Sequence, residues 1–254
     1  MATNHRPKQI LVIDVGGRHV KLWRKLSDTP KEIKSGRGMD ARLMVRVVRE
    51  ATKGWRYDGV SLGYPGRVDN GRAVAEPKNL KHGWLDFDYA KAFGCPVRIM
   101  NDAAMQALGS YEGGLMLFLG LGTGLGSTLI SNGVIVPLAL GDLPFRRAGT
   151  FGHYLSGDGL KRLGETRWRR AVHEAVDVFY RAFEPDYIVL GGGKSELLDR
   201  LPRGVRRGGN HRAFIGGCRM WERKWQAAVP RSPILAASEW SSRRRSRDGA
   251  RPAS

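Results

Sequence analysis

Cysteine is almost missing from this sequence: only Cys95 and Cys218 occur in 254 residues. Two cysteines exclude a disulfide scaffold and a cysteine-rich zinc site. The opening segment, MATNHRPKQI, has no apolar run before the first predicted strand, so no secretory signal is visible. We therefore expect a cytoplasmic protein, and its length is sufficient to bury a substantial apolar core.

Acidic residues are also few. The 24 Asp and Glu stand against 43 Lys and Arg, which gives a net charge of +19 and a pI near 10.6. This excess favours a polyanionic partner or substrate without identifying one. The segment 241–254 carries five Arg and one Asp among Ser, Pro and Gly, and we expect it to be a disordered basic tail that binds nucleic acid at most non-specifically. Without this tail the chain still carries about +15.

Charged residues are absent from Gly113 to Gly141, a length that could suggest a membrane span. Eight of these residues are glycine, and Ser131-Asn132-Gly133 is a typical hairpin turn. Buried strands explain the segment better, so no membrane association is expected. The 34 glycines show no three-residue period, which excludes collagen.

Apolar spacing predicts strands and helices in alternation. The predicted strands are Gln9–Val15, His19–Leu26, Gly59–Tyr64, Val97–Met100, Leu115–Leu121, Ser127–Ile130 and Tyr187–Leu190. The predicted helices are Met39–Thr52, Ala103–Tyr111, Arg167–Phe183 and Ile215–Ala228, and 67–83 is predicted to be a loop. Two halves each begin with a strand, a glycine turn and a returning strand. This order predicts an α/β protein with a smaller lobe at 1–111 and a larger lobe at 112–240, whose last helix packs back on the first lobe.

Three glycine turns each follow an apolar strand: Asp14-Val15-Gly16-Gly17, Gly122 to Gly126, and Gly191 to Gly193. A phosphate group must approach backbone N–H donors closely, and a Cβ obstructs that approach. One such turn alone would be interpreted as a tight turn. Because sheets of this class bind ligands beyond their strand ends, we expect at least two of the three to contact phosphate. None has the spacing of a P-loop, and none fits GxGxxG well.

Several polar residues have both a chemical and a structural interpretation. Asp14 can hold Mg²⁺ through water or can form a turn with its own backbone. Asp102 can act as a general base or, like Asn101, can cap the following helix. His153 is by default a polar loop histidine. Asn79 and Trp84 can bind a sugar or can be a loop and its anchor.

The motifs occur in a recognisable order: IDVGG, LGYPGRVD, PKNLKHGW, NDAA, LGLGTGLGS, GTFGH and PDYIVLGGG. From about Ile10 to about Gly217 the chain resembles the ROK family of sugar kinases, within the actin-like ATPase superfamily. The PD-strand-GGG block, GGNHRAFIGG and the missing cysteine cluster are most similar to the polyphosphate-dependent glucokinase branch. The resemblance implies a two-lobed, ribonuclease H-like fold with a cleft between the lobes, and it suggests a homodimer.

The resemblance also implies a chemistry and a site. A terminal phosphoryl group would pass from polyphosphate, ATP or both to the 6-hydroxyl of glucose or a related hexose, with Asp102 as the base and Mg²⁺ held through water by Asp14. Gly66, Asn79, Asn101 and His153 would line the sugar site. Phosphate or nucleotide would meet Asp14, Gly16, Gly17, Lys21, Gly122, Thr123, Gly124, Gly126, Gly191, Gly192 and Gly193.

Two departures from the family pattern leave alternatives open. Arg18-His19 replaces the usual Thr-Asn/Lys of the first glycine turn, and Thr150 replaces a Glu that bonds sugar hydroxyls. One alternative is a catalytically weak relative that binds a sugar or a polyanion, and another is a kinase with a different acceptor sugar. About nine residues precede the first strand, so we do not expect a DNA-binding repressor. The missing cysteine motif predicts no structural zinc.

Overall fold

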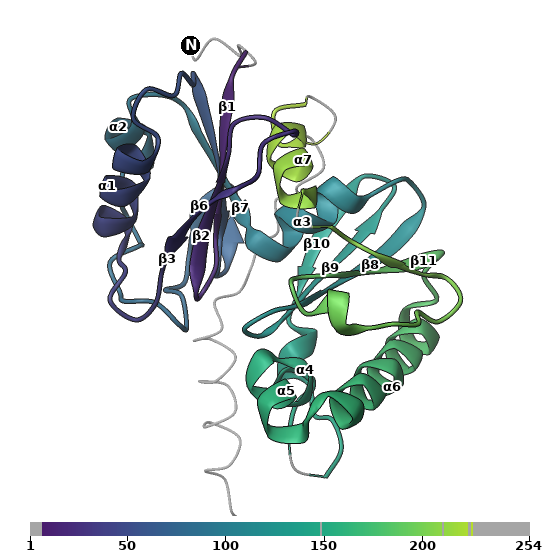
Figure 1. The fold of residues 1–254 in the computed structure, drawn as a ribbon. Coiled ribbons are helices and arrows are strands. Elements are labelled where there is room, and N and C mark those ends of the chain that lie inside the picture. The colour runs from purple at the N-terminus through teal and green to yellow at the C-terminus, as the bar shows by residue number, and fades with distance from the viewer. Residues whose placement is uncertain (1–6, 148, 210, 223–224, 226–254) are drawn as a thin grey trace, which may run out of the picture.

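The computed structural model describes residues 7–147, 149–209, 211–222 and 225, so the predicted tail at 241–254 lies outside the described residues. Two five-stranded sheets form the framework, with helices on the outside of each sheet and two helices between them (Figure 1). The charge-free segment Gly113–Gly141 lies in the strands of the second sheet, as predicted. In the part of the chain that is described, no helix has the length and apolarity to cross a membrane.

The first sheet has the strand order β3-β2-β1-β4-β7. Its strands are β1 (Ile10–Val15), β2 (His19–Trp23), β3 (Lys31–Lys34), β4 (Gly59–Tyr64) and β7 (Val97–Asn101). β1, β2 and β3 are antiparallel, whereas β4 and β7 run parallel to β1. Helices α1 (Ala41–Ala51) and α2 (Tyr89–Phe93) cover the outer face (Figure 1), where α1 begins at its N-cap Asp40.

The second sheet repeats this topology with the order β10-β9-β8-β11-β12. Its strands are β8 (Leu115–Leu121), β9 (Leu125–Ser131), β10 (Val134–Leu138), β11 (Tyr187–Gly191) and β12 (Val205–Arg207). η1 (Leu140–Asp142), α4 (Phe151–Leu155), α5 (Gly157–Leu163), α6 (Glu165–Phe183) and η2 (Ser195–Leu197) complete this half. The apolar faces of α4 and α6 pack on its outer face.

Strand alternation divides the core into layers. In β1, Leu11 and Ile13 pack toward α1, while Val12 faces the layer between the sheets. In β8, Leu117 packs toward α6, while Phe118 faces that same middle layer. Because successive strand residues point to opposite faces, each sheet contributes one face to a shared central core.

Helices α3 (Asp102–Ser110) and α7 (Arg212–Arg219) occupy the central layer and touch backbone to backbone. A Cβ on Gly109 would stand 1.8 Å from the Arg212 carbonyl oxygen, and a Cβ on Gly216 would stand 1.8 Å from that of Met105. No side chain fits at either crossing point. α7 also packs on β1 and β4, and Ser61 Oγ donates to the Gly217 carbonyl (2.6 Å).

The predicted strands are all present, but other elements differ. The last helix was wrongly placed at 215–228: α7 spans Arg212–Arg219, and 226–228 lie outside the described residues. The predicted loop 67–83 contains a small hairpin of β5 (Val68–Asp69) and β6 (Arg72–Ala73). β3, β12, α2, α4 and α5 were not predicted, because they are short and too few apolar residues mark them. The predicted lobe boundaries stay a prediction.

Candidate active site

Two carboxylates lie where the first sheet meets α3. Asp14 is near the end of β1 and faces the central layer, and Asp102 is the first residue of α3 after β7. Gln106, one turn along α3, donates to Asp14 Oδ2 (3.2 Å). Gly63 on β4 leaves room beside them, since a Cβ there would stand 3.3 Å from Asp14 Oδ1. The parallel strands therefore bring both acids to one edge of the sheet.

The surroundings of these two acids favour their protonated forms. Burial raises the pKa of Asp14 to about 6, although Lys21 and the Gln106 amide oppose the shift. Burial raises the pKa of Asp102 to about 7, and the negative charge of Asp14 adds to this rise. Both residues nevertheless keep some accessible surface. A deep but reachable carboxylate with a pKa near neutrality can accept a proton from a bound hydroxyl group.

Asn101 is the residue that caps α3, and this decides between the two interpretations of Asp102. Asn101 Oδ1 accepts from Ala104 N–H (3.1 Å), and its Nδ2 donates to the Gly66 carbonyl (3.0 Å). Asp102 Oδ1 accepts from the adjacent Ala103 N–H (2.8 Å), which is a local contact and not the helix cap. The helix start is thus already satisfied by Asn101, and it fixes the Gly66 turn at the same time.

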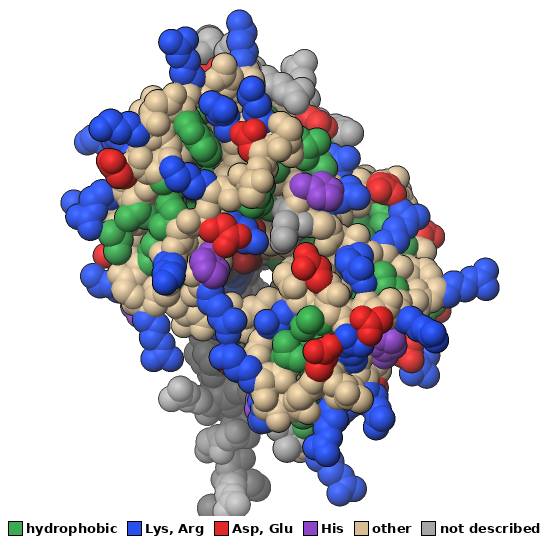
Figure 2. Space-filling view, in the orientation of Figure 1, with side chains coloured by type: hydrophobic (Ala, Val, Ile, Leu, Met, Phe, Trp, Pro, Cys, Tyr) green, Lys and Arg blue, Asp and Glu red, His purple; other side chains and the backbone are tan. Residues whose placement is uncertain are grey.

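The three glycine turns are neighbours. A Cβ on Gly17 would stand 3.4 Å from Thr123 Oγ1, which joins the first turn to the second. Gly126, where β9 leaves the second turn, lies against Ala103, with 2.7 Å from its Cβ position to that of the alanine. The third turn contacts the second through Gly192, whose Cβ position is 2.4 Å from the Leu121 carbonyl oxygen. The turns and Asp102 therefore lie around one region between the two sheets. Figure 2 shows a hollow between the two halves of the molecule.

The glycines of these turns differ in whether the fold requires a residue without a side chain. Gly192 has a φ of +77°, and a Cβ on Gly191 would collide with the Phe118 ring at 2.4 Å, so the fold itself requires both. Gly124 and Gly193 have no atom within 4 Å of the Cβ position and no positive φ. The described contacts do not require a glycine at these two positions, and a missing Cβ there leaves the backbone open to close approach.

The segment with Asn79 is held as a rigid loop beside the first turn. The Asn79 Cβ lies 3.4 Å from the Cβ position of Gly17. The Glu76 carboxylate accepts from the N–H groups of Gly83 (3.0 Å) and Trp84 (3.2 Å). Trp84 is fully buried and packs near Tyr64, so it is the anchor of the loop and cannot offer a face to a sugar.

His153 and Thr150 lie on the opposite side, in the second half. Thr150 is the N-cap of α4, and its Oγ1 accepts from His153 N–H (3.2 Å). His153 is exposed, and the adjacent Gly152 contacts Gly141. Asp142, next in the chain, pairs with Lys78 (3.3 Å), which immediately precedes Asn79. Through these contacts His153 is brought near the Asn79 loop.

Basic side chains are distributed around the region. Lys21 lies opposite Asp14 on β2 and pairs with Glu32 (3.3 Å). Arg18, at the family departure in the first turn, pairs with Asp158 of α5 (3.7 Å). Gln106 was not predicted as a site residue, although its position four residues after Asp102 places both on one face of the predicted helix.

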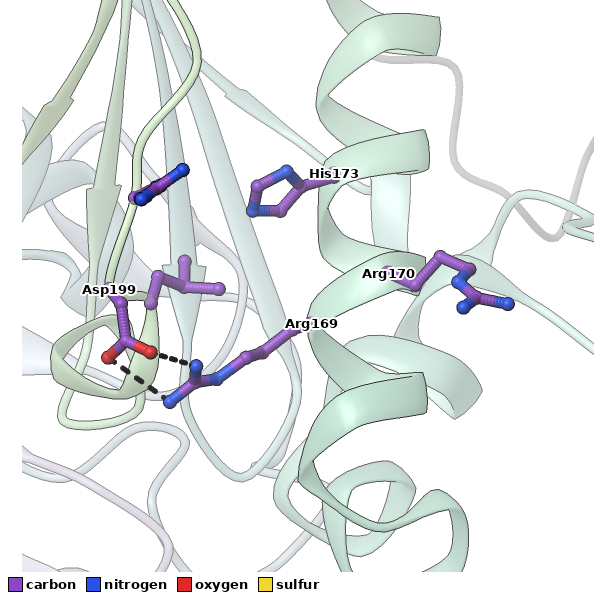
Figure 3. A pocket seen from close by; sticks show the side chains of 6 residues that line it. Arg169, Arg170, His173 and Asp199 are labelled. Atoms are coloured by element: carbon purple, nitrogen blue, oxygen red, sulfur yellow. Dashed lines mark hydrogen bonds and ion pairs between the residues drawn. The ribbon is translucent and has the colours of Figure 1, made fainter.

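A separate cavity of about 350 Å³ lies between α6 and the segment after η2. Figure 3 shows Arg169 turned toward Asp199, with which it forms an ion pair, and Arg170 turned away. Glu165 also pairs with Arg169. Two carboxylates neutralise this arginine, and no residue of the three glycine turns lines the cavity.

Sheet topology and the paired carboxylates define a two-lobed protein of the actin-like ATPase fold, as predicted. The chain belongs to the ROK family, whose model matches residues 25–160, more than half of the sequence. The polyphosphate glucokinase of Mycobacterium tuberculosis is 27% identical over 174 residues, which cover 62% of this chain and 64% of that protein. That of Mycobacterium leprae is 27% identical over 219 residues, covering 75% of this chain and 61% of the relative. The chain thus spans less than two thirds of these relatives.

Solved structures agree on the fold. The inorganic polyphosphate/ATP-glucomannokinase from Arthrobacter sp. strain KM has a TM-score of 0.70 at 23% identity, covering 84% of this chain and 98% of that chain. A ROK family glucokinase from Streptomyces griseus, solved with glucose and AMPPNP, has a TM-score of 0.65 at 18% identity, covering 84% and 98%. At these identities the likeness shows the shared fold alone.

Proposed function

We propose that this protein is a sugar kinase that transfers a terminal phosphoryl group from polyphosphate or ATP to the 6-hydroxyl of glucose or a related hexose. One observation carries the proposal: Asp102, with a pKa of about 7, lies beside three adjacent glycine turns. A base and an anion-accepting backbone at one place are what phosphoryl transfer to an alcohol needs. The names of the mycobacterial relatives and of the Arthrobacter enzyme support the substrate pair.

In the proposed reaction the sugar hydroxyl oxygen attacks the terminal phosphorus of the donor. The new O–P bond forms as the donor's bridging P–O bond breaks, and the shortened donor leaves with the electron pair. Asp102 accepts the hydroxyl proton, and its pKa near 7 suits this transfer at neutral pH. Asn101, which holds Gly66, together with Asn79 and His153 would position the sugar.

Gly16 and Gly17, with Lys21 nearby, would bind phosphate at the first turn, and the second and third turns would extend this surface. Gly124 and Gly193 would leave the backbone open to phosphate. The other turn residues shape the turns: Gly122, Thr123, Gly126, Gly191 and Gly192. Closure of the two lobes would exclude water, which competes with the sugar as an acceptor.

The residues present fit Mg²⁺ at Asp14. Its carboxylate is costly to bury without a counter-charge, as the raised pKa indicates, and Asp102 adds a second acid nearby. No cluster of three or more metal-binding side chains occurs in the described residues, which suits an ion that takes few carboxylates and completes its shell with water and phosphate. When bound, Mg²⁺ would neutralise charge on the donor phosphates.

A second candidate is a catalytically weak protein that binds a sugar or polyanion. Thr150 favours it, because its hydroxyl is used in capping α4 while the family glutamate is missing. For the same reason, Thr150 does not fix which sugar is the acceptor. Glucose, mannose and N-acetylmannosamine are therefore compared as acceptors in the assay. A homodimer and a cytoplasmic location stay predictions.

The deciding experiment measures sugar phosphate formed from each acceptor with polyphosphate or ATP, in wild type and Asp102→Asn. Asparagine retains an oxygen for the Ala103 N–H, so the fold should persist. We expect kcat to fall by about 10²–10⁴-fold, the usual contribution of a general base. Asp177→Asn, on the exposed face of α6, is the matched control. Equal activity of wild type and Asp102→Asn with every pair would reject the kinase.

A further inference from the structure

Lys194 follows the third glycine turn and reaches over the second. Its backbone N–H donates to the Leu121 carbonyl (3.3 Å), which ties the two turns together. Its side chain crosses Gly157, since a Cβ on that glycine would stand 2.7 Å from Lys194 Cε and 3.4 Å from Nζ. The N–H of Gly157 donates to the Gly122 carbonyl (2.9 Å). The ammonium group therefore lies beside the second turn, in space that a glycine at 157 leaves open.

This ammonium group has no anionic partner among the residues that the structure describes. Lys194 is half-buried, and no ion pair or side-chain hydrogen bond of the described chain includes its Nζ. Asp158, adjacent to Gly157, is shared by Arg18 (3.7 Å) and Lys161 (3.9 Å). Partial burial of a cation without a counter-charge is unfavourable, and an anionic ligand at the second turn would offset that cost.

The position of Lys194 selects which part of the donor it can meet. The second turn contacts Ala103, next to Asp102, through Gly126, and contacts the third turn through Leu121. A donor whose terminal phosphate faces Asp102 would therefore extend along this turn toward Lys194. Polyphosphate carries negative charge along its whole length, whereas ATP ends in an uncharged nucleoside beyond three phosphates.

We infer that Lys194 binds an inner phosphate of the donor and favours a polyphosphate chain over ATP. The inference rests on the proposed function, and it adds a donor-specificity residue to that site. An ammonium group is a point charge with three rotatable donors, so it accepts the varied orientations of a flexible chain. Arg18 supplies a second cation near the same helix from the other half.

The test measures binding of inorganic tripolyphosphate by calorimetry, without sugar, and the KM of polyphosphate, ATP and glucose. Lys194→Met removes the charge and keeps the length of the side chain. We expect tripolyphosphate affinity and polyphosphate KM to worsen by about tenfold, which corresponds to about 1.4 kcal/mol. The KM of ATP should change by less, the KM of glucose should not change, and the loss should shrink at high salt.

Two further variants keep the outcome decisive. Gly157→Ala retains every charge but places a methyl group in the path of Lys194, so it should weaken tripolyphosphate binding as well. Lys161→Met removes a charge from the exposed side of α5 and should leave binding unchanged. Equal losses in Lys161→Met and Lys194→Met, or equal loss for ATP and polyphosphate, would overturn the inference.

Failure of the inference and failure of the proposed function give different results. If wild type phosphorylates a sugar but Lys194→Met binds tripolyphosphate normally, the role of Lys194 is rejected and the kinase stands. If wild type phosphorylates nothing but Lys194→Met still weakens tripolyphosphate binding, the phosphate site stands and the kinase is rejected.

Discussion

The two sheets share one topology but end in different chemistry. In the first, Asp14 of β1 lies opposite Lys21 of β2 in the strand register, and in the second the corresponding residues are Gly120 of β8 and Gly126 of β9. The absence of a side chain at Gly126 affects the packing of α3. Because Gly126 is bare, the start of α3 lies directly against β9, which places Asp102 between the sheets. The first half therefore supplies acids, and the second half supplies backbone close enough to face them.

The helices that follow each sheet extend the comparison. α3 follows β7, α7 follows β12, and the two cross at Gly109 and Gly216. α3 begins with a capping asparagine and a buried acid, whereas no side chain caps α7 and it begins with Arg212. The same arrangement of a helix after a sheet thus presents a carboxylate at the start of α3, whereas α7 makes packing contacts. Fold alone does not determine which end is chemically active.

Removing the acid that the second half lacks should have the largest effect. Asp14→Asn should lower kcat by about a hundredfold or more, because the proposed Mg²⁺ site loses its charge. It should also lower the pKa of Asp102, since the charge of Asp14 contributes to raising it. The acid limb of the kcat/KM profile should then move to lower pH. Asp28→Asn, in an exposed i,i+4 pair with Arg24, is the control. An unchanged acid limb would mean that the two acids do not interact.

Adding a side chain to the second half should damage the arrangement in a different way. Gly126→Ala places a Cβ 2.7 Å from that of Ala103, so overpacking should lower the free energy of unfolding by about 1–3 kcal/mol. Displacement of α3 should also lower kcat. Gly124→Ala, two residues away, meets no atom within 4 Å and should leave stability unchanged while raising the donor KM. Urea unfolding and initial rates distinguish the two, and equal stabilities would contradict the close contact.

The acids of the first half should also give the protein a pH-dependent stability. Their pKa values of about 6 and about 7 exceed the ordinary 3.8, so the folded state binds protons more tightly than the unfolded state. The stabilisation by these protons is complete below pH 4 and is lost as pH rises through 7. Asp102→Asn should therefore raise the free energy of unfolding by up to about 4 kcal/mol at pH 8 but only by about 1 kcal/mol at pH 4.5, since each pKa unit corresponds to about 1.4 kcal/mol. An equal change at both pH values would contradict burial of the charge.

Much of this comparison was accessible from the sequence. The long strands are apolar runs closed by glycine, so their positions and the repeat of strand, turn and strand followed from periodicity. The motifs also led to Asp14, Asn101 and Asp102, which the structure brings together. The short α4 and α5 did not follow, because their five- and seven-residue lengths leave too little pattern and tertiary packing determines them.

Other features depend on contacts that no local pattern contains. An indole ring such as that of Trp84 can stack on a sugar when it is exposed. Here the Glu76 carboxylate holds the loop so that the ring is buried. Lys194 was not predicted, because its relevance comes from Gly157, distant in sequence and adjacent in space. Spacing also did not decide between Asn101 and Asp102 as the cap. Side-chain geometry was required for each of these.

The smallest effect is expected from the charges that join the two halves. Lys78 and Asp142 pair across them at 3.3 Å, with 80% and 71% of their side chains exposed. Such pairs contribute about 0–1 kcal/mol, because water screens the charges and ordering the side chains costs entropy. Asp142→Asn should thus change the free energy of unfolding by less than about 0.5 kcal/mol. The surface control Asp177→Asn should change it by a similar amount.

A larger loss would have a clear meaning. If Asp142→Asn cost more than about 1 kcal/mol at low salt and nothing at high salt, the halves would be joined mainly by charge. The structure favours the opposite, because α3 and α7 touch without intervening side chains and Arg219 donates to the carbonyls of Leu108 (2.6 Å) and Tyr111 (2.9 Å). Contacts of that kind are shielded from salt. A junction held by the central helices therefore does not depend on the surface pairs.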